Sequence, residues 1–468
     1  MNILLTCTVL IVPGILPAVV IAGRRPVTPF LVPLTTALIA GVAVLAMFVT
    51  AGSLVPWFTV VALTVNLLAL AALLKGAWLR PGDSSGRYPW VTFLVLLVAV
   101  VWPLVVLRVP VIGYDAQAIW LLHAAMVFGG HNTLVADMTN RSYLFSNPDY
   151  PPLYPGLAAL VYATQGRLDY HLGVAAIAVL NACTLGVVGT GVMEAVERRT
   201  RALRWGAILL MVAFLCGAIY GVAGQFAING YADLLWAGAA VGATLYGLVL
   251  SPSRRHFVVA CLCIAVAALA KNEGFVTSVI VACLIGARMF TCRPQGVRIW
   301  LRMAALGAAL APTVAWIIAV RSKGLSDAYL GSSAESTLTR LSAATVGMWG
   351  QLHLVLAALS VLLLGALLLR SHRVGFGLAN PAWLWAVAVL STLAIAATYV
   401  LGSYEIHWWL GSSVNRTTIF ANALLLTDMA VWAVVAIQGV DQPAWPNPEA
   451  SAKSRLEAAD LSSALARP

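Results

Sequence analysis

Five short stretches of this chain combine carboxylates, cations and aromatic rings between runs of apolar residues. They are GYDAQAIW (Gly113–Trp120), NPDYPPLYP (Asn147–Pro155), NGYAD (Asn229–Asp233), KNEG (Lys271–Gly274) and SYEIHWWLGSSVNR (Ser403–Arg416). A carboxylate can act as a general base toward a hydroxyl group, and fixed cations can stabilise charge that develops on a leaving group. A carboxylate beside stacking rings, as in Asp149 with its two neighbouring tyrosines, is typical of a sugar site.

Each stretch also has a purely structural explanation. Lys271 and Glu273 could only cap helix ends at the membrane surface, and Asp233 could be an N-cap. Arg416 could extend toward the headgroups, and Asp115 could be a turn residue. However, a charge near the membrane interior costs roughly 2.5–3.5 kcal/mol, so such residues usually face a cavity or pair with one another. This cost favours a shared site.

Three further polar residues carry less information. His123 and His407 are expected to pack or to form hydrogen bonds rather than to bind a metal, because neither has a partner at ligand spacing. Asp428 lies within the last apolar run, where it is either a satisfied core group or part of a cavity wall. The prolines of Asn147–Pro155 fix an extended entry into a helix, which by itself requires no chemistry.

The composition defines the environment of these residues. Of the 468 residues, 61% are hydrophobic and 10% are charged, whereas soluble domains have about 25% charged residues. The sequence therefore predicts an all-α polytopic membrane protein. The net charge of +11 does not indicate nucleic-acid binding, because the charges fall in short loops rather than on one basic face.

Apolar runs long enough to cross a bilayer as helices predict about thirteen spans. They lie near 3–22, 29–50, 55–75, 90–108, 170–192, 204–222, 231–250, 256–270, 275–290, 299–320, 347–369, 381–401 and 417–437. The apolar piece 152–165 is too short to span comfortably, so we expect a re-entrant or surface helix there.

The distribution of charge predicts the orientation. With the N-terminus outside, the cytoplasmic loops hold 17 basic residues against three acids, and the outer side holds eight against nine, as the positive-inside rule requires. All five polar stretches then lie on the outer side. The predicted organisation is a transmembrane domain over 1–437, with a long outer loop at 109–169 that carries short surface helices, and a disordered cytoplasmic tail over 438–468.

These motifs, in this order and on one side, resemble those of the GT-C glycosyltransferases. The similarity is to the dolichyl-phosphate-mannose protein mannosyltransferases, the bacterial lipid A aminoarabinose transferases and, more closely, the rhizobial lipopolysaccharide galacturonosyltransferase-like branch. It extends from about Trp90 to Ile437. The matching positions are Asp115 as the early-loop aspartate, Asp149–Pro155 as the Pro-rich end of that loop, Gly230–Asp233, Lys271–Gly274 and Gly411–Arg416.

The chain departs from this family in three respects. Three spans precede the one that leads into the outer loop, and no large outer domain follows the last span. Asp115 stands alone where some relatives have a pair of acidic residues, which leaves a role for a divalent metal open. No metal ligands are predicted.

The resemblance implies a membrane glycosyltransferase of lipopolysaccharide or cell-wall glycan biosynthesis. It would transfer a monosaccharide, with inversion, from a polyprenyl-phosphate donor to a glycan, lipid or protein acceptor at the outer face of the bacterial cytoplasmic membrane. Asp115 is the expected base and Asp149 the second catalytic candidate. The expected substrate-binding residues are Tyr114, Tyr150, Tyr154, Asp233, Lys271, Glu273, His407 and Arg416. A secondary transporter and a noncatalytic envelope-assembly subunit are the alternatives. The sequence does not identify the sugar or the acceptor.

Overall fold

The computed structural model describes most of the apolar part of the chain. The described residues are 3–23, 25–74, 112–130, 134–196, 205–250, 253–292, 299–325, 335–351 and 382–439, with the isolated positions 97 and 333. Within these ranges the secondary structure consists of helices and contains no strand. The protein is therefore an all-α membrane protein, as the composition predicts.

The helices follow the apolar runs closely. The elements up to residue 165 are α1 (Ile3–Ala22), α2 (Thr28–Thr50), α3 (Leu54–Leu74), η2 (Ala116–Leu121), α5 (Leu122–Gly129), α6 (Leu134–Thr139), η3 (Arg141–Ser146) and α7 (Leu153–Gln165). The remaining elements are α8 (Tyr170–Val196), α9 (Trp205–Ala223), η6 (Gly224–Ala227), α10 (Asp233–Thr244), η7 (Leu245–Val249), α11 (Arg254–Ala270), α12 (Asn272–Cys292), α13 (Ile299–Ser322), α14 (Thr337–Gln351), α16 (Ala382–Leu401), α17 (Ile406–Thr417) and α18 (Ile419–Gly439).

Seven of the described helices are long and apolar enough to cross a membrane: α1, α2, α3, α8, α12, α13 and α16. The predicted run 90–108 apart from residue 97, most of 347–369 and nearly all of the predicted tail 438–468 lie outside the described residues. The total of about thirteen spans therefore stays a prediction.

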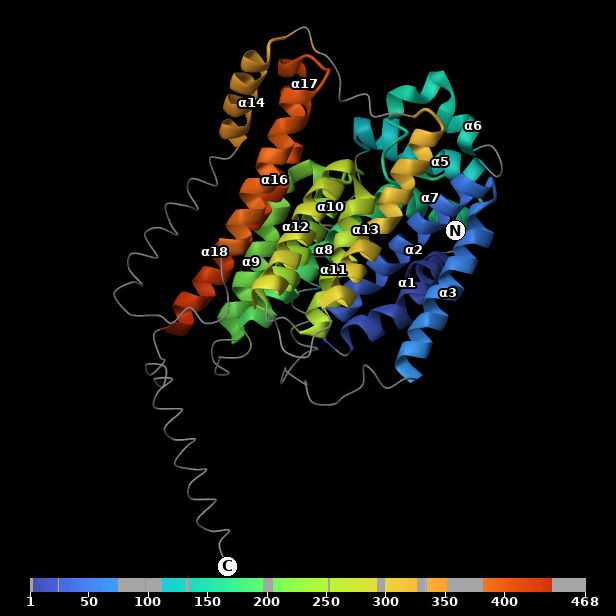
Figure 1. The fold of residues 1–468 in the computed structure, drawn as a ribbon. Helices are drawn as coiled ribbons and strands as arrows, with labels where there is room; N and C mark the ends of the chain where they lie inside the picture. The colour runs from blue at the N-terminus through green and yellow to red at the C-terminus, as the bar shows by residue number, and fades with distance from the viewer. Residues whose placement is uncertain are drawn as a thin grey trace, which may run out of the picture.

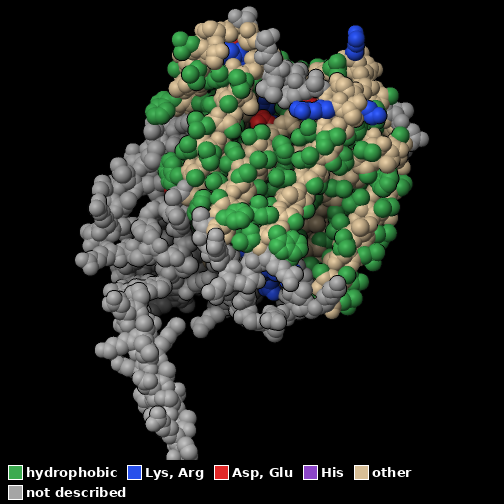
Figure 2. All heavy atoms as spheres, in the orientation of Figure 1, with side chains coloured by type: hydrophobic (Ala, Val, Ile, Leu, Met, Phe, Trp, Pro, Cys, Tyr) green, Lys and Arg blue, Asp and Glu red, His purple; other side chains and the backbone are tan. Residues whose placement is uncertain are grey.

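Helices α10 and α11 form the centre of the bundle. All twelve residues of α10 are buried, and α10 packs against α8, α11, α12 and α18 (Figure 1). By contrast, α3 lies at the edge, and Leu67 and Leu74 are 64% and 78% exposed. Figure 2 shows a broad belt of hydrophobic side chains around the visible face, with charged side chains near its upper and lower margins. Such a belt suits contact with lipid tails.

The segment 152–165, predicted as a re-entrant or surface helix, forms the buried helix α7, so the surface alternative is wrong and the re-entrant one stays a prediction. Residues Leu153 through Tyr162 of α7 are buried, and α7 packs between α2, α5 and α8. The segment LYPGLAALVYATQ has no charged residue, and its small residues Gly156, Ala158 and Ala159 allow neighbouring backbones to approach closely. Hence the segment predicted as an outer loop contributes a core element, α7, to the bundle.

The last polar stretch, predicted as an outer loop, contains the amphipathic helix α17. Glu405 caps it, because its carboxylate accepts hydrogen bonds from the backbone N–H groups of His407 and Trp408. Its buried residues recur at helical spacing: Ile406, Trp409, Leu410, Val414 and Thr417. Figure 1 shows α17 at the upper end of the bundle together with α14, α5 and α6. We call this the α17 end.

Candidate functional site at the α17 end

An ion pair between Asp115 and Arg416 joins two segments that are 301 residues apart in the sequence. The Nη1 atom of Arg416 donates a hydrogen bond to Oδ2 of Asp115. The two side chains keep 14% (Arg416) and 24% (Asp115) of their surface exposed. Asp115 directly precedes η2, and Arg416 lies in the last turn of α17. The pair is therefore partly open to ligands.

Tyr231 contacts both members of this pair. Its ring centroid lies 5.1 Å from Cζ of Arg416, a favourable position for a cation–π interaction. Its hydroxyl oxygen accepts a hydrogen bond from the backbone N–H of Asp115 at 3.4 Å. Burial, together with the charge of Asp115, raises the pKa of Tyr231, so the phenol keeps its proton and can donate a hydrogen bond.

The segment with Tyr231 approaches the segment with Asp115 very closely. The backbone N–H of Gly113 donates to the carbonyl of Asn229 at 2.8 Å, and a Cβ atom at Gly113 would collide with the Tyr231 ring. Gly230 has φ +91° and faces Ala116, a conformation that glycine adopts readily. These two glycines allow two polar motifs to meet directly.

A second charged group surrounds Lys271. Its Nζ atom lies 2.7 Å from Oδ1 of Asp233 and 3.0 Å from Oε1 of Glu273. Asp233 begins α10, and Lys271 is the single residue between α11 and α12. The lysine backbone is extended, with φ −161° and ψ 154°, which ends α11 and turns the chain into α12. The motif KNEG is thus a one-residue helix break that presents two charges at one corner.

The two charged groups interact with each other. Burial alone would lower the pKa of Arg416, but Asp233 and Asp115 outweigh it and raise that pKa above its usual range. Likewise, burial would lower the pKa of Lys271, and the attraction of Asp233 and Glu273 raises it. Both cations therefore stay charged. Together with three carboxylates they form what we call the charged cluster: Asp115, Asp233, Lys271, Glu273 and Arg416.

Two polar atoms of the charged cluster are buried without a hydrogen-bond partner among the described residues: Nε of Arg416 and Oε2 of Glu273. Buried polar atoms without partners are uncommon in folded proteins and cost free energy. A ligand or ordered water that entered the cluster could satisfy them. The cluster thus has the groups for binding an anion and for accepting a proton.

Asp149 borders the cluster through its neighbours. Its Oδ2 atom accepts a hydrogen bond from the side chain of Asn272 at 3.0 Å, and Asn272 lies between Lys271 and Glu273 in the sequence. The backbone carbonyl of Asp149 accepts from the indole of Trp316 at 2.9 Å. These contacts attach the Pro-rich segment to α12 and α13, so Asp149 has an evident structural role.

The predicted aromatic residues have different environments. Tyr150 is buried and stacks on Trp120, with ring centroids 5.1 Å apart. Tyr154 is fully buried, and its hydroxyl donates to the carbonyl of Gly173 at 3.5 Å. Tyr114 is 78% exposed. Tyr114 directly precedes Asp115 of the charged cluster, and Tyr150 directly follows Asp149.

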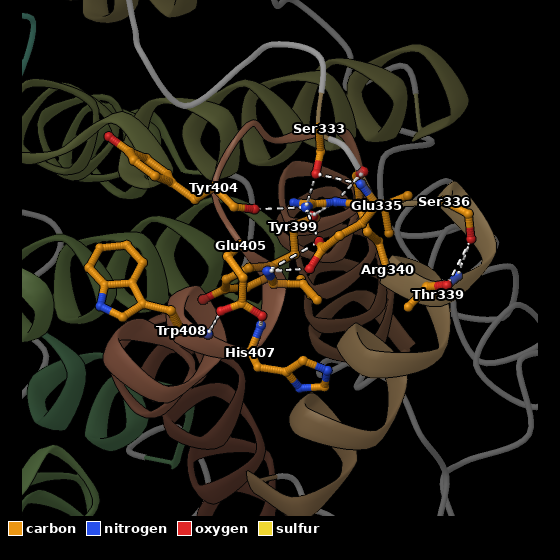
Figure 3. Close-up of polar contacts among 12 residues, drawn as sticks. Ser333, Glu335, Ser336, Thr339, Arg340, Tyr399, Tyr404, Glu405, His407 and Trp408 are labelled. Atoms are coloured by element: carbon orange, nitrogen blue, oxygen red, sulfur yellow. Dashed lines mark hydrogen bonds and ion pairs between the residues drawn. The ribbon is translucent and has the colours of Figure 1, made fainter.

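The other sequence candidates lie away from the cluster. His407 is exposed, and Figure 3 shows its imidazole pointing away from the side chain of Arg340, a residue of α14. His123 is buried and hydrogen-bonded to Ser146, as the sequence predicts. Asp428 is buried, with one carboxylate oxygen accepting from the Trp385 indole at 3.1 Å. Within the described ranges, no group of three or more His, Cys, Asp or Glu residues is arranged to hold a metal ion.

Sequence reasoning missed three residues that shape the site. Tyr231 was within reach, because it lies inside the NGYAD motif between Gly230 and Asp233. Tyr399 and Arg340 stand alone in apolar or weakly polar surroundings, and their contacts depend on helix packing that no local pattern reports. Comparison with protein-family models, with curated proteins and with solved structures finds no match to this chain.

Proposed function

We propose that this protein is a membrane glycosyltransferase that moves a monosaccharide from a polyprenyl-phosphate donor to a hydroxyl of a glycan, lipid or protein acceptor. One observation carries the proposal. Four motifs, selected from the sequence for their chemistry alone, contribute Asp115, Asp233, Lys271, Glu273 and Arg416 to one cluster. Helix capping at four separate sites would not require this convergence.

Arg416 and Lys271 are the proposed ligands of the donor phosphate. A phosphate leaving group gains negative charge as the glycosidic bond breaks, and cations already fixed at that position stabilise the transition state. The guanidinium of Arg416 can bind two phosphate oxygens as a bidentate ligand. The long isoprenoid tail would lie along the apolar helix surfaces.

Asp115 is the proposed base that accepts the proton of the acceptor hydroxyl. In the structure its carboxylate is engaged by Arg416. A donor phosphate that bound Arg416 would compete for the same guanidinium and release the carboxylate toward the acceptor. Proton removal would then accompany attack on the anomeric carbon from the face opposite the phosphate, with inversion.

The location of the cluster favours this function over secondary transport. Transporters place charged residues near the middle of the bilayer, within interrupted helices of repeated halves. Here Asp233 begins a helix, Lys271 separates two helices and Arg416 lies in a final turn. We propose that this end faces outward from the bacterial cytoplasmic membrane, in a GT-C-like bundle of about thirteen spans.

The decisive experiment is a transfer assay. Membranes with the unaltered protein, with Asp115→Asn and without the protein are incubated with a panel of radiolabelled polyprenyl-phosphate sugars. Transfer of one sugar to endogenous acceptors, dependent on Asp115, is the expected result. Binding of a donor without transfer would identify a noncatalytic assembly subunit, and absence of both binding and transfer would reject the proposal.

A further inference from the structure

A buried arginine that belongs to none of the sequence motifs holds the corner between α16 and α17. Arg340, on α14, is 1% exposed. Its Nη2 donates to the carbonyl of Tyr399 at 2.6 Å, and its Nε donates to the carbonyls of Tyr399 and Val400 at 3.2 and 3.1 Å. Its Nη1 donates to the carbonyl of Tyr404 at 2.7 Å (Figure 3).

These carbonyls are the ones that α16 cannot satisfy itself. The last four carbonyls of a helix have no intrahelical donor, and a cation near them interacts favourably with the helix dipole. Tyr399 and Val400 are in the final turn of α16, which ends at Leu401. Arg340 therefore fixes the end of α16, and through Tyr404 it also fixes the turn that follows.

The partner of Arg340 fixes the beginning of α17. Glu335 Oε2 lies 2.6 Å from Nη1 of Arg340 and accepts a hydrogen bond from the backbone N–H of Ile406 at 3.2 Å. Ile406 is the first residue of α17, whose N–H has no intrahelical acceptor. One partly buried ion pair thus joins the end of one helix to the start of the next, and Figure 3 shows both sides of this corner.

Tyr399 extends this connection toward the charged cluster. Its carbonyl is held by Arg340, while its hydroxyl hydrogen-bonds to Ser413 at 2.8 Å and to Thr417 at 3.1 Å. Ser413 and Thr417 flank Arg416 on α17. The chain of contacts therefore runs from Arg340 through Tyr399 to the turn that carries Arg416.

We infer that Arg340 is a positioning residue for Arg416, and that it sets the affinity for the anionic donor without contacting it. This inference rests on the proposed function, in which Arg416 binds the donor phosphate. A guanidinium is required because the contacts use three nitrogen atoms in one plane, which a lysine ammonium cannot reproduce.

The test compares two Arg→Lys variants in the full-length protein. Arg340→Lys should raise the apparent KM for the polyprenyl-phosphate donor about tenfold, which corresponds to ~1.4 kcal/mol, with a smaller change in kcat. Arg167→Lys is the control. Arg167 is 65% exposed, and among the described residues its ion pair is with the neighbouring Asp169. Its KM should stay normal. Hydrogen–deuterium exchange over residues 406–417 should increase in Arg340→Lys and not in Arg167→Lys.

A second variant tests the link through the tyrosine. Tyr399→Phe keeps the ring and the carbonyl and removes the hydroxyl that binds α17. It should raise the donor KM by several-fold, and the double variant with Arg340→Lys should show less than the product of the two effects, because coupled residues are not additive.

The outcomes separate the inference from the proposed function. If both variants have normal donor KM values, or if Arg340→Lys lowers only the yield of folded protein, the inference is wrong. If the unaltered protein uses no donor, the proposed function fails. In that case, hydrogen–deuterium exchange over residues 406–417 in Arg340→Lys still tests whether Arg340 orders the segment that carries Arg416. Unchanged exchange would show that it does not.

Discussion

The two ends of α11 carry two different clusters of buried charge. At the α17 end, Lys271 follows the last residue of α11 and belongs to the charged cluster. At the opposite end, His256 in the first turn of α11 and Arg25 in the α1–α2 connection both contact Glu194 of α8, at 2.8 and 2.6 Å. The 17 residues of α11 separate the two by roughly 25 Å, at about 1.5 Å per residue.

A buried ion pair is not by itself a functional site. Such pairs often contribute little net stability and can simply hold elements in place. The pair of Glu194 with Arg25 joins the N-terminal hairpin to the core, and the side chains of Glu194 and His256 are 9% and 4% exposed. In the charged cluster, by contrast, Asp115 and Glu273 are 24% and 22% exposed, and carboxylates outnumber cations. We therefore assign structure to one end and chemistry to the other.

The largest expected effect is the presence or absence of thiol labelling, which tests whether the α17 end faces the outside of the membrane. In a protein without its native cysteines, Asp137→Cys should react with an impermeant thiol reagent added to intact cells, whereas Gly296→Cys should not. The basis is the excess of basic residues in the loops assigned to the cytoplasm. Gly296 lies outside the described residues. The reverse labelling pattern would place the charged cluster inside.

Asp115→Asn should reduce turnover about 10²–10⁴-fold, the usual contribution of a general base. Asparagine keeps the size of the side chain and most of its hydrogen bonding but cannot accept the proton. Donor affinity should not fall, because the lost interaction belongs to the transition state and because Arg416 loses a carboxylate that competes with the donor phosphate. Kinetics are measured on purified protein matched for folded content by size-exclusion profile.

Asp149→Asn is the matched control for that variant. An asparagine there can still accept the hydrogen bond from Asn272, so the Pro-rich segment should stay in place. A smaller loss of turnover and an increased acceptor requirement are expected. An inactive Asp149→Asn with near-normal Asp115→Asn would transfer the role of base to Asp149.

At the opposite end, Glu194→Ala should lower stability rather than alter catalysis. Removing one partner of a buried ion pair costs about 3–5 kcal/mol, because the remaining charge stays buried. The thermal midpoint in detergent should fall, while the donor KM of the folded fraction should equal that of the unaltered protein. A changed KM at normal stability would contradict the division between the two ends.

Arg416→Ala should raise the donor KM by about 10–100-fold, equivalent to ~1.4–2.8 kcal/mol of lost binding. Arg416→Lys should recover only part of this, since an ammonium lacks the planar fork that fits phosphate oxygens. Protein abundance is measured as the control for folding. If Arg416 only extends to the headgroups, both variants should have the donor KM of the unaltered protein.

Much of the helical fold could be predicted from hydropathy because the signal is local. The bounds of α1, α2 and α3 differ from the predicted runs by at most one residue. The predictions failed where tertiary packing decides. The apolar segment 152–165 is too short to span, so the sequence leaves a re-entrant and a surface helix open, and the packing that buries it excludes the surface helix. The polar residues after Ser403 favour a loop. In the structure this segment forms the helix α17, with its polar and apolar residues on opposite faces.

The candidate site was predictable in its members and not in its pairings. The sequence indicates Asp115 and Arg416 as site residues because charges are costly in apolar surroundings. That they contact each other, and that Asp233 and Glu273 share Lys271, depends on the order in which helices pack, which the sequence does not state. Arg340 could not be found at all, because its partners are mainly backbone carbonyls and these have no sequence signal.

The smallest effect concerns His123, a buried histidine in neither cluster. Its Nε2 atom lies 3.0 Å from the hydroxyl of Ser146, and that hydroxyl donates to the carbonyl of Tyr143 at 2.6 Å. The hydroxyl hydrogen is therefore engaged, so the imidazole is the donor, in its neutral form with the proton on Nε2. Burial lowers the pKa of His123 to about 4, against about 6.5 in an unfolded chain.

Between these two values the unfolded chain binds a proton that the folded protein does not. Stability must therefore fall as the pH falls below about 6.5, by up to ~1.4 kcal/mol per pH unit, and this loss stops below about pH 4. His123→Asn removes the titrating group and leaves a side chain that can reach Ser146, so its thermal midpoint should decline less between pH 7 and pH 5.5. Over that interval the free energy of unfolding of the unaltered protein should fall by about 1.2 kcal/mol more than that of the variant. If the stabilities of the two proteins depend on pH in the same way, His123 takes up protons in the folded protein. The segment around α5 would then expose a histidine that the structure buries.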